Sequence, residues 1–323
     1  MLVPRELPPI DPATAAERAV LGDELQQRGD PQGELIGMQL ALAALPPATP
    51  PLKRSIIERK IAAVIDRHHD ALFGPLAPYL DSLSRPDVRL PALEVVRWQA
   101  GFLDTVRIRD TKAIQIPQLC GHLRGLPIAR HLRRVWLGLC NVSRAIVTIV
   151  QTPLTLVSLV VDNRGPDSAG LRSTAHLQVL LRSLEELVVL YPATLSLPLA
   201  SPVLRSLALT GTSTAPVFGD LPALELLALR SFVVDASLFD QPATELLFEQ
   251  CTFTPAVLEE LLASTRRRRI TIHASLDDSH LDVVVRLADQ IAQLDALVLY
   301  GHRFTPEAVE RARERLPANV EIE

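Results

Sequence analysis

Four residues near the middle of the chain carry side chains that can ligate zinc. Cys120 and His122 lie two positions apart, and His131 and Cys140 complete the set. A structural zinc site needs four nitrogen or sulfur donors arranged as a tetrahedron. The chain has no paired Cys-x-x-Cys motif, and Cys140 fills a position of the repeat described below. We therefore predict neither a metal site nor a cofactor.

Other reactive side chains lack the partners that catalysis needs. His68, His69 and Asp70 are consecutive, and consecutive residues of a helix point in different directions, which favours a polar helix end. Cys120 and Cys251 have no base at a recognisable spacing, and no glycine-rich phosphate loop occurs among 14 glycines. We predict no catalytic residues and a protein that is not an enzyme.

The run 266–269 consists of four arginines and is the densest cluster of charge in the chain. Such a run suggests contacts with nucleic-acid phosphates. No aromatic residues interleave to stack on bases, and the net charge of -4 gives no general attraction. We predict a solvated loop here. A nucleic-acid-binding scaffold that also uses Arg107, Arg109 and Arg134 is a less favoured alternative.

Composition excludes several classes of protein. Leucine accounts for 56 of 323 residues and the apolar share is 48%, which argues against disorder. Three cysteines cannot all pair, so a disulfide scaffold is not expected. No signal peptide is indicated, and polar residues and Pro153 interrupt the longest apolar run, 145–161. We predict a cytoplasmic protein without a membrane segment.

Three helices are predicted in the first part of the chain. Apolar residues recur at helical spacing over 13–27, 33–44 and 52–70. The sequence Arg-Gly-Asp-Pro at 28–31 ends the first helix, and prolines between 46 and 51 separate the second from the third. These residues predict a helical domain over 1–85.

Beyond residue 90 the template Leu-x-x-Leu-x-Leu-x-x-Asn/Cys recurs. Successive copies start 19 to 30 residues apart. Leucine-rich repeats have a similar period of roughly 20 to 29 residues. Clear copies begin at Leu132, Leu154, Leu204, Leu224, Ala243 and Leu294, and weaker ones include Leu184–Val189 and Ile270–Ile272.

Each copy predicts a strand whose second and third template leucines point to the same face. A returning segment covers that face, and stacking of neighbouring copies buries a continuous core. The segment 251–255 (CTFTP) is echoed by 302–306 (HRFTP), and each precedes a predicted helix, 255–264 or 305–316. A short strand near 320–322 is expected to follow.

Several stretches of the chain resemble a known family. The run 25–39 (LQQRGDPQGELIGMQ) closely resembles the repeat-companion domain that precedes leucine-rich repeats in some bacterial proteins, and 72–76, 98–108 and 126–132 agree with it. The resemblance implies a non-enzymatic leucine-rich-repeat protein. The expected fold is an α/β leucine-rich-repeat solenoid of about eight repeats over 86–323, with a parallel sheet on its concave side, a helical N-terminal cap and a C-terminal cap.

The concave face of this solenoid is the predicted binding surface. Residues between the buried leucines point into it, and they are basic at one end and apolar or small in the middle. Apolar surface patches and Trp–Arg pairs are typical of interaction sites. The predicted partner-binding residues are Arg107, Arg109, Arg134, Trp136, Leu156, Val160, Val188, Leu190, Leu226, Arg230, Leu247 and Glu249. N-terminal helices folded over this face would explain the same leucines as core, so both explanations stay open.

The sequence thus predicts a scaffold for protein or peptide recognition, with Trp136 and Arg134 as anchors. The partner is unidentified. A regulator or inhibitor of a partner enzyme, a nucleic-acid-binding scaffold and a self-associating protein are the alternatives. Steep salt dependence would distinguish the nucleic-acid class.

Overall fold

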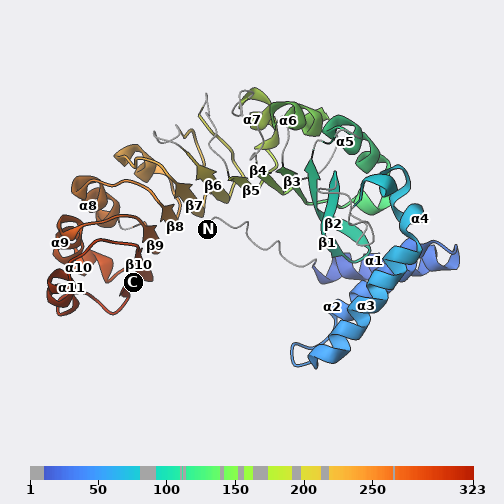
Figure 1. The fold of residues 1–323 in the computed structure, drawn as a ribbon, viewed down its shortest axis with the longest axis horizontal. Coiled ribbons are helices and arrows are strands. Elements are labelled where there is room, and N and C mark those ends of the chain that lie inside the picture. The colour runs from blue at the N-terminus through green and yellow to red at the C-terminus, as the bar shows by residue number, and fades with distance from the viewer. Residues whose placement is uncertain are drawn as a thin grey trace. The chain divides into compact units, whose positions relative to one another are not determined.

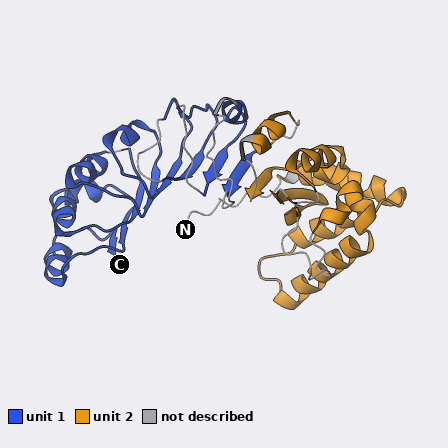
Figure 2. Ribbon diagram, turned by 45° about the horizontal axis from the view of Figure 1, so that its top comes forward, with its two compact units in different colours: residues 1–4, 157–164, 168–323 blue, residues 5–156, 165–167 orange. Residues whose placement is uncertain are grey.

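The computed structural model describes residues 11–80, 92–109, 111, 114–138, 142–151, 156–162, 174–190, 198–211, 218–264 and 266–323. These residues belong to two compact units (Figure 2). We call the described part of 5–156 the N-terminal unit (unit 2 in Figure 2) and that of 157–323 the C-terminal unit (unit 1). The predicted domain boundary at 85/86 lies outside the described residues.

The N-terminal unit begins with the three predicted helices, which the structure confirms. They are α1 (Pro12–Gln27), α2 (Pro31–Ala43) and α3 (Pro51–Arg67), followed by the short α4 (His69–Phe73) and the 3-10 helix η1 (Gly74–Tyr79). Aspartates cap the first two helices: Thr14 N donates to Asp11 Oδ1 and Gln32 N donates to Asp30 Oδ1, both at 2.9 Å. Proline follows each cap, where its missing N–H costs nothing.

A β-hairpin follows that the sequence did not predict. Strands β1 (Leu93–Gln99) and β2 (Phe102–Arg109) are antiparallel, and Ala100 and Gly101 turn between them with φ of 47° and 79°. Two residues with positive φ match the right-handed twist of the flanking strands. A Cβ on Gly101 would lie 2.1 Å from Cγ1 of Ile36, so α2 packs directly on the turn. Gly101 N also donates to Gln39 Oε1 at 2.8 Å.

Buried charged groups join the hairpin to the rest of the N-terminal unit. The side chain of Asp104 is 1% exposed and accepts a hydrogen bond from Arg133 Nε at 2.6 Å. Arg97 Nε lies 3.5 Å from the same carboxylate. Arg133 Nη2 and Arg18 Nη1 donate to Oε1 and to the carbonyl oxygen of Gln99, at 2.7 and 2.9 Å. Helix α1, β1, β2 and the segment before β3 thus share one network.

The N-terminal unit continues with α5 (Ile116–Gly125), the 3-10 helix η2 (Pro127–Ala129), β3 (Arg134–Gly138) and α6 (Val142–Gln151). Strand β3 is parallel to β2, with Arg107 opposite Trp136. Helices α5 and α6 lie on one side of these strands (Figure 1). Leu119 and Leu123 of α5 are buried, at no more than 1% exposed.

Parallel strands form the sheet of the C-terminal unit, each paired with its neighbour in the chain. Strand order follows chain order, so the sheet is open rather than closed into a barrel. The template leucines such as Leu187, Leu207 and Leu227 are buried, as the repeat predicts. The strands are β4 (Ser158–Asp162), β5 (Glu186–Val189), β6 (Ser206–Thr210), β7 (Leu226–Arg230), β8 (Glu245–Glu249), β9 (Arg269–His273), β10 (Ala296–Tyr300) and β11 (Val320–Ile322).

Helices of the C-terminal unit lie on one side of this sheet (Figure 1). We call the opposite side the open face. No helix among the described ranges is long and apolar enough to cross a membrane. The helices are α7 (Thr174–Leu180), the 3-10 helix η3 (Ala236–Asp240), α8 (Pro255–Ala263), α9 (Asp278–Arg286), α10 (Ala288–Ile291) and α11 (Pro306–Arg313).

The two echoed segments start helices in the same way. Thr254 Oγ1 accepts a hydrogen bond from Val257 N at the start of α8, and Thr305 Oγ1 accepts one from Ala308 N at the start of α11, both at 3.3 Å. In both helices proline follows the capping threonine. The internal match therefore marks a repeated strand–loop–helix unit.

Candidate functional site

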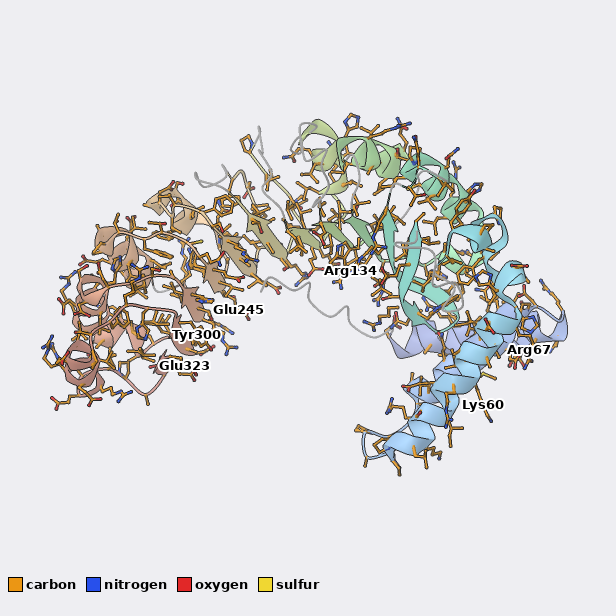
Figure 3. The ribbon with its side chains drawn as sticks, viewed as in Figure 1. Lys60, Arg67, Arg134, Glu245, Tyr300 and Glu323 are labelled. Atoms are coloured by element: carbon orange, nitrogen blue, oxygen red, sulfur yellow. The ribbon has the colours of Figure 1, made fainter. Side chains whose placement is uncertain are left out.

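Alternate residues of the strands form three rows across the open face of the C-terminal unit. Register pairs place the members of a row opposite one another on adjacent strands. The middle row, with one exception, is apolar, and polar and charged residues dominate the rows beside it. Figure 3 shows Glu245 and Tyr300, from the two flanking rows, on the side away from the helices. The first row is Ser158, Glu186, Ser206, Leu226, Glu245, Arg269 and Ala296, the middle row is Val160, Val188, Ala208, Ala228, Leu247, Thr271 and Val298, and the last row is Thr210, Arg230, Glu249, His273 and Tyr300.

Three apolar residues of the predicted binding surface are buried. Leu156, Val160 and Val188 are exposed by 1%, 0% and 1%, so the expectation that they present an apolar surface is wrong. Leu156 precedes β4 and is not part of a strand. Val160 and Val188 are in register on adjacent strands, where branched side chains pack closely against each other. The alternation of side chains along a strand predicts the face of the sheet to which each one points. It does not predict whether neighbouring residues bury that side chain.

Other predicted residues of this face are accessible. Leu190, Leu226, Arg230 and Leu247 are partly exposed, whereas Glu249 is buried at 8% exposed. Arg230 Nη2 lies 3.9 Å from Glu249 Oε1, and Arg230 Nε donates to Gln250 Oε1 at 3.3 Å.

Strand β10 extends the face beyond the predicted residues. Val298 and Tyr300 continue the middle and last rows, opposite Thr271 and His273. The copy of the template that begins at Leu294 was the signal for them, because it predicts this strand and therefore its alternating residues.

A shallow pocket opens at the carboxyl ends of β8, β9 and β10. Gln250 and Gly301 have φ of 55° and 65°, so the chain leaves these strands through the left-handed region. A Cβ on Gly301 would lie 2.7 Å from Cδ2 of His273, which is why glycine is required there. The pocket encloses about 300 Å³ and is lined by Gln250, Cys251, Thr252, Phe253, His273, Ala274, Ser275 and Gly301.

In the N-terminal unit, a row of different chemistry crosses β1, β2 and β3. Glu94, Arg107 and Trp136 are in register, on the side of the strands where Arg134 also lies (Figure 3). Arg107 Nη1 and Arg109 Nη2 both contact Glu94 Oε2, at 3.0 and 2.9 Å. The Cζ atom of Arg107 lies 4.1 Å from the centre of the Trp136 ring, a cation–π contact. We call Glu94, Arg107, Arg109 and Trp136 the arginine cluster.

The structure therefore brings four predicted residues together, because Arg107, Arg109, Arg134 and Trp136 share this face. Glu94 was missed, because β1 was not predicted as a strand. Arg109 and Arg134 are each 8% exposed, and the side chain of Arg107 is 25% exposed.

Two of the zinc candidates, Cys120 and His131, make packing contacts in the N-terminal unit. Cys120 is buried in α5, and burial raises its pKa to about 12, so the thiol stays protonated at neutral pH. The ring of His131 packs edge-on against Phe102 with centres 4.6 Å apart. Within the described ranges no group of three or more His, Cys, Asp or Glu side chains could hold a metal ion. Cys140 lies outside the described residues.

Cys251 and one residue of the arginine run, Arg267, make buried hydrogen bonds to the backbone. Burial raises the pKa of the Cys251 thiol, which donates to the carbonyl oxygen of Leu229 at 3.4 Å. Arg267 is 3% exposed, so the prediction of a fully solvated loop is wrong at this residue. Its guanidinium donates to the carbonyl oxygens of Gln241, at 2.7 Å, of Phe239, at 2.6 Å, and of Ala243. Its neighbours Arg266, Arg268 and Arg269 are exposed.

The fold and the two faces define a class, an α/β protein with an open and mostly parallel sheet. The chain matches no protein-family model and no curated protein sequence. Among solved structures it is similar to a crystal structure of a Bacteroides fragilis protein determined by the Northeast Structural Genomics Consortium. The two are 14% identical with a TM-score of 0.47, over 84% of this chain and 83% of that chain.

Proposed function

We propose that this chain is a leucine-rich-repeat protein with an N-terminal repeat-companion domain. Two features support the proposal. The template leucines are buried at equivalent positions of successive parallel strands, and the segment 25–39 resembles the companion domain. Stacked repeats of this kind present long surfaces suited to extended partners.

The proposed function is recognition of an extended peptide segment of another protein through the open face of the C-terminal unit. The observation that carries it is an apolar strip on β6, β7 and β8, which consists of Ala208, Ala228 and Leu247 of the middle row and Leu226 of the first row. Polar and charged residues dominate the rest of the first row and the last row. Val160, Val188 and Val298 of the middle row are buried and are not part of the strip. Ala208 and Ala228 are buried, whereas Leu226 and Leu247 beside them are partly exposed and supply the accessible apolar area. An extended segment can place alternate apolar side chains on the strip and polar ones against the flanking rows.

The proposal assigns no catalytic step to this face. Cys251, at the edge of the pocket, is a buried thiol with a raised pKa and is bonded to a backbone carbonyl oxygen. Binding energy would come from apolar area, and polar contacts would set the register of the peptide.

A displayed library of random dodecapeptides, selected on the full chain, tests the function. Enriched peptides are synthesised and their affinities measured by titration calorimetry. We expect Leu247→Arg, which places a long cationic side chain on the strip, to weaken them by about tenfold or more. Val233→Arg is the matched control, because Val233 is 52% exposed and belongs to none of the three rows.

The results separate the open face from other surfaces of the chain. Loss of binding in Leu247→Arg, with binding kept in Val233→Arg, supports the proposal. Equal binding by Leu247→Arg and the unmodified chain, or a library that yields no binding peptide, contradicts it.

A further inference from the structure

We propose that the arginine cluster of the N-terminal unit binds a carboxylate of an acidic peptide. The inference rests on the proposed function, because it names the chemistry of the same kind of partner. The Arg107 guanidinium would hold the carboxylate, and Trp136 and Glu94 would position Arg107.

Arg107 is held in place and keeps free donors. Its Nη1 atom contacts Glu94 Oε2 at 3.0 Å, and its guanidinium lies over the Trp136 ring at 4.1 Å. Among the residues that the structure describes, its Nε and Nη2 atoms have no acceptor. A guanidinium edge with two parallel N–H groups matches a carboxylate, and a guanidinium whose position is already fixed loses less entropy on binding.

Arg107 does not have the Glu94 carboxylate to itself. Glu94 Oε2 contacts Arg107 Nη1 at 3.0 Å and also Arg109 Nη2 at 2.9 Å. An oxygen shared by two guanidinium groups neutralises Arg107 only in part, which favours a second anion beside Arg107.

Trp136 provides a second donor beside Arg107. Its Nε1 atom is buried and has no hydrogen-bond partner among the described residues. A buried donor without an acceptor is costly, and a carboxylate or carbonyl oxygen that enters beside Arg107 would accept from it. Arg107 already lies over the Trp136 ring, so this ring is not a free platform for stacking a nucleic-acid base. An acidic peptide therefore fits the cluster better than a nucleic acid.

Two fluorescein-labelled octapeptides test the inference on the full chain by fluorescence anisotropy at low ionic strength. One alternates leucine with glutamate and the other alternates leucine with glutamine, so they differ only in charge. We expect the glutamate peptide to bind at least about tenfold more tightly, because a pair of charge-assisted hydrogen bonds supplies a gain in affinity of that size. Arg107→Gln should abolish this preference, and Arg107→Lys should keep only part of it because an ammonium group lacks the paired donors.

Further variants separate a site from general charge effects. Trp136→Phe keeps the ring under Arg107 and removes the N–H, so the preference should fall by a few-fold. Arg205→Gln is the matched control, because this arginine belongs to the C-terminal unit and pairs with Glu225 at 2.6 Å. It should leave the preference unchanged. Thermal unfolding of each variant shows whether it is folded.

Each remaining outcome contradicts a defined claim. A preference that survives Arg107→Gln, or is lost equally in Arg205→Gln, overturns the carboxylate site. Tighter Arg107-dependent binding of a single-stranded oligonucleotide of equal charge overturns the choice of an acidic peptide. A third outcome is that the glutamine peptide binds, that Leu247→Arg weakens its binding, and that the glutamate peptide binds no more tightly than the glutamine peptide. The proposed function then stands and this inference fails. If neither peptide binds, the inference fails, and the library selection decides the proposed function separately.

Discussion

At the scale of single residues, buried charged side chains connect the helices and strands of the N-terminal unit. Asp104 has a side chain 1% exposed and contacts Arg133 at 2.6 Å and Arg97 at 3.5 Å. Removing one member of a buried ion pair leaves its partners charged and without compensation. Asp104→Asn, which keeps the shape, should therefore lower the free energy of unfolding by about 3 to 5 kcal/mol.

Urea denaturation followed by circular dichroism measures this loss. The control is Glu225→Gln, which breaks the exposed pair with Arg205 and should cost no more than about 1 kcal/mol. A loss in Asp104→Asn no larger than that of the control would show that the network adds nothing to stability.

Asp277 sets a pH dependence in the C-terminal unit. Hydrogen bonds to its side chain, from Ser279 first and then His280, lower its pKa from 3.8 to about 2. A carboxyl group with a depressed pKa in the folded state stabilises the fold above its unfolded pKa, and this contribution is lost as the pH falls through the folded value. The contribution of Asp277 should thus disappear between about pH 4 and pH 2.

Carbon-13 NMR titration of the carboxyl group measures this pKa directly. Asp277→Asn should flatten the decline of stability in that window. A midpoint at or above 3.8 would mean that the capping hydrogen bonds do not persist in solution.

At the scale of elements, the echoed threonines test whether equivalent caps have equivalent strength. Thr254 caps α8 through one hydrogen bond, from Val257 N. Thr305 caps α11 and also bonds to Asp278 through its N and Oγ1 atoms, each at 2.8 Å. Thr254→Ala should cost about 1 kcal/mol, and Thr305→Ala about 2 kcal/mol because a side-chain hydrogen bond to a carboxylate is lost as well.

Both costs are read from urea unfolding curves of the full chain. Serine at either position keeps the hydroxyl and should restore most of the stability. An equal cost for the two alanine variants would mean that the bond to Asp278 contributes nothing.

Strands and helices were predictable to the extent that their signals are local. A period of two places Leu226, Ala228 and Arg230 on one face of β7 whatever else the chain does, and the registers confirm that arrangement. The hairpin of β1 and β2 was missed because its turn is Ala100-Gly101, and alanine at positive φ gives no sequence signal. Elements whose signal is a side-chain period were therefore predictable, and an element defined by an unusual turn was not.

The burial of a side chain was less predictable than the face to which it points, because burial depends on residues distant in the chain. Arg267 belongs to what reads as a solvated run, yet its acceptors lie on residues 24 to 28 positions earlier. Glu94 joins Arg107 only because β1 folds back on β2. The sequence predicted the face of β7 and β8 on which Leu226, Arg230 and Leu247 lie, whereas the arginine cluster became complete only with the structure.

At the scale of the whole molecule, the high leucine content and the repeated strand architecture have one cause. A repeat that buries the same template position in each copy needs the same aliphatic side chain many times, and 56 leucines meet that need. Packing between neighbouring repeats has a second consequence. A destabilising change in one repeat mainly affects the stability of the adjacent repeats. The strands of the C-terminal unit each pair only with the strands before and after them.

Leu261→Ala tests how far a local defect spreads through the chain. Leu261 of α8 is 0% exposed, so the cavity should lower stability by about 2 to 5 kcal/mol. Hydrogen exchange read by mass spectrometry should show the largest loss of protection in β8, β9 and β10, and little change in β1 and β2 of the N-terminal unit. Asp104→Asn should give the opposite pattern. Uniform loss in both variants would instead mean that the chain unfolds as one cooperative body, because exchange would then report only global opening.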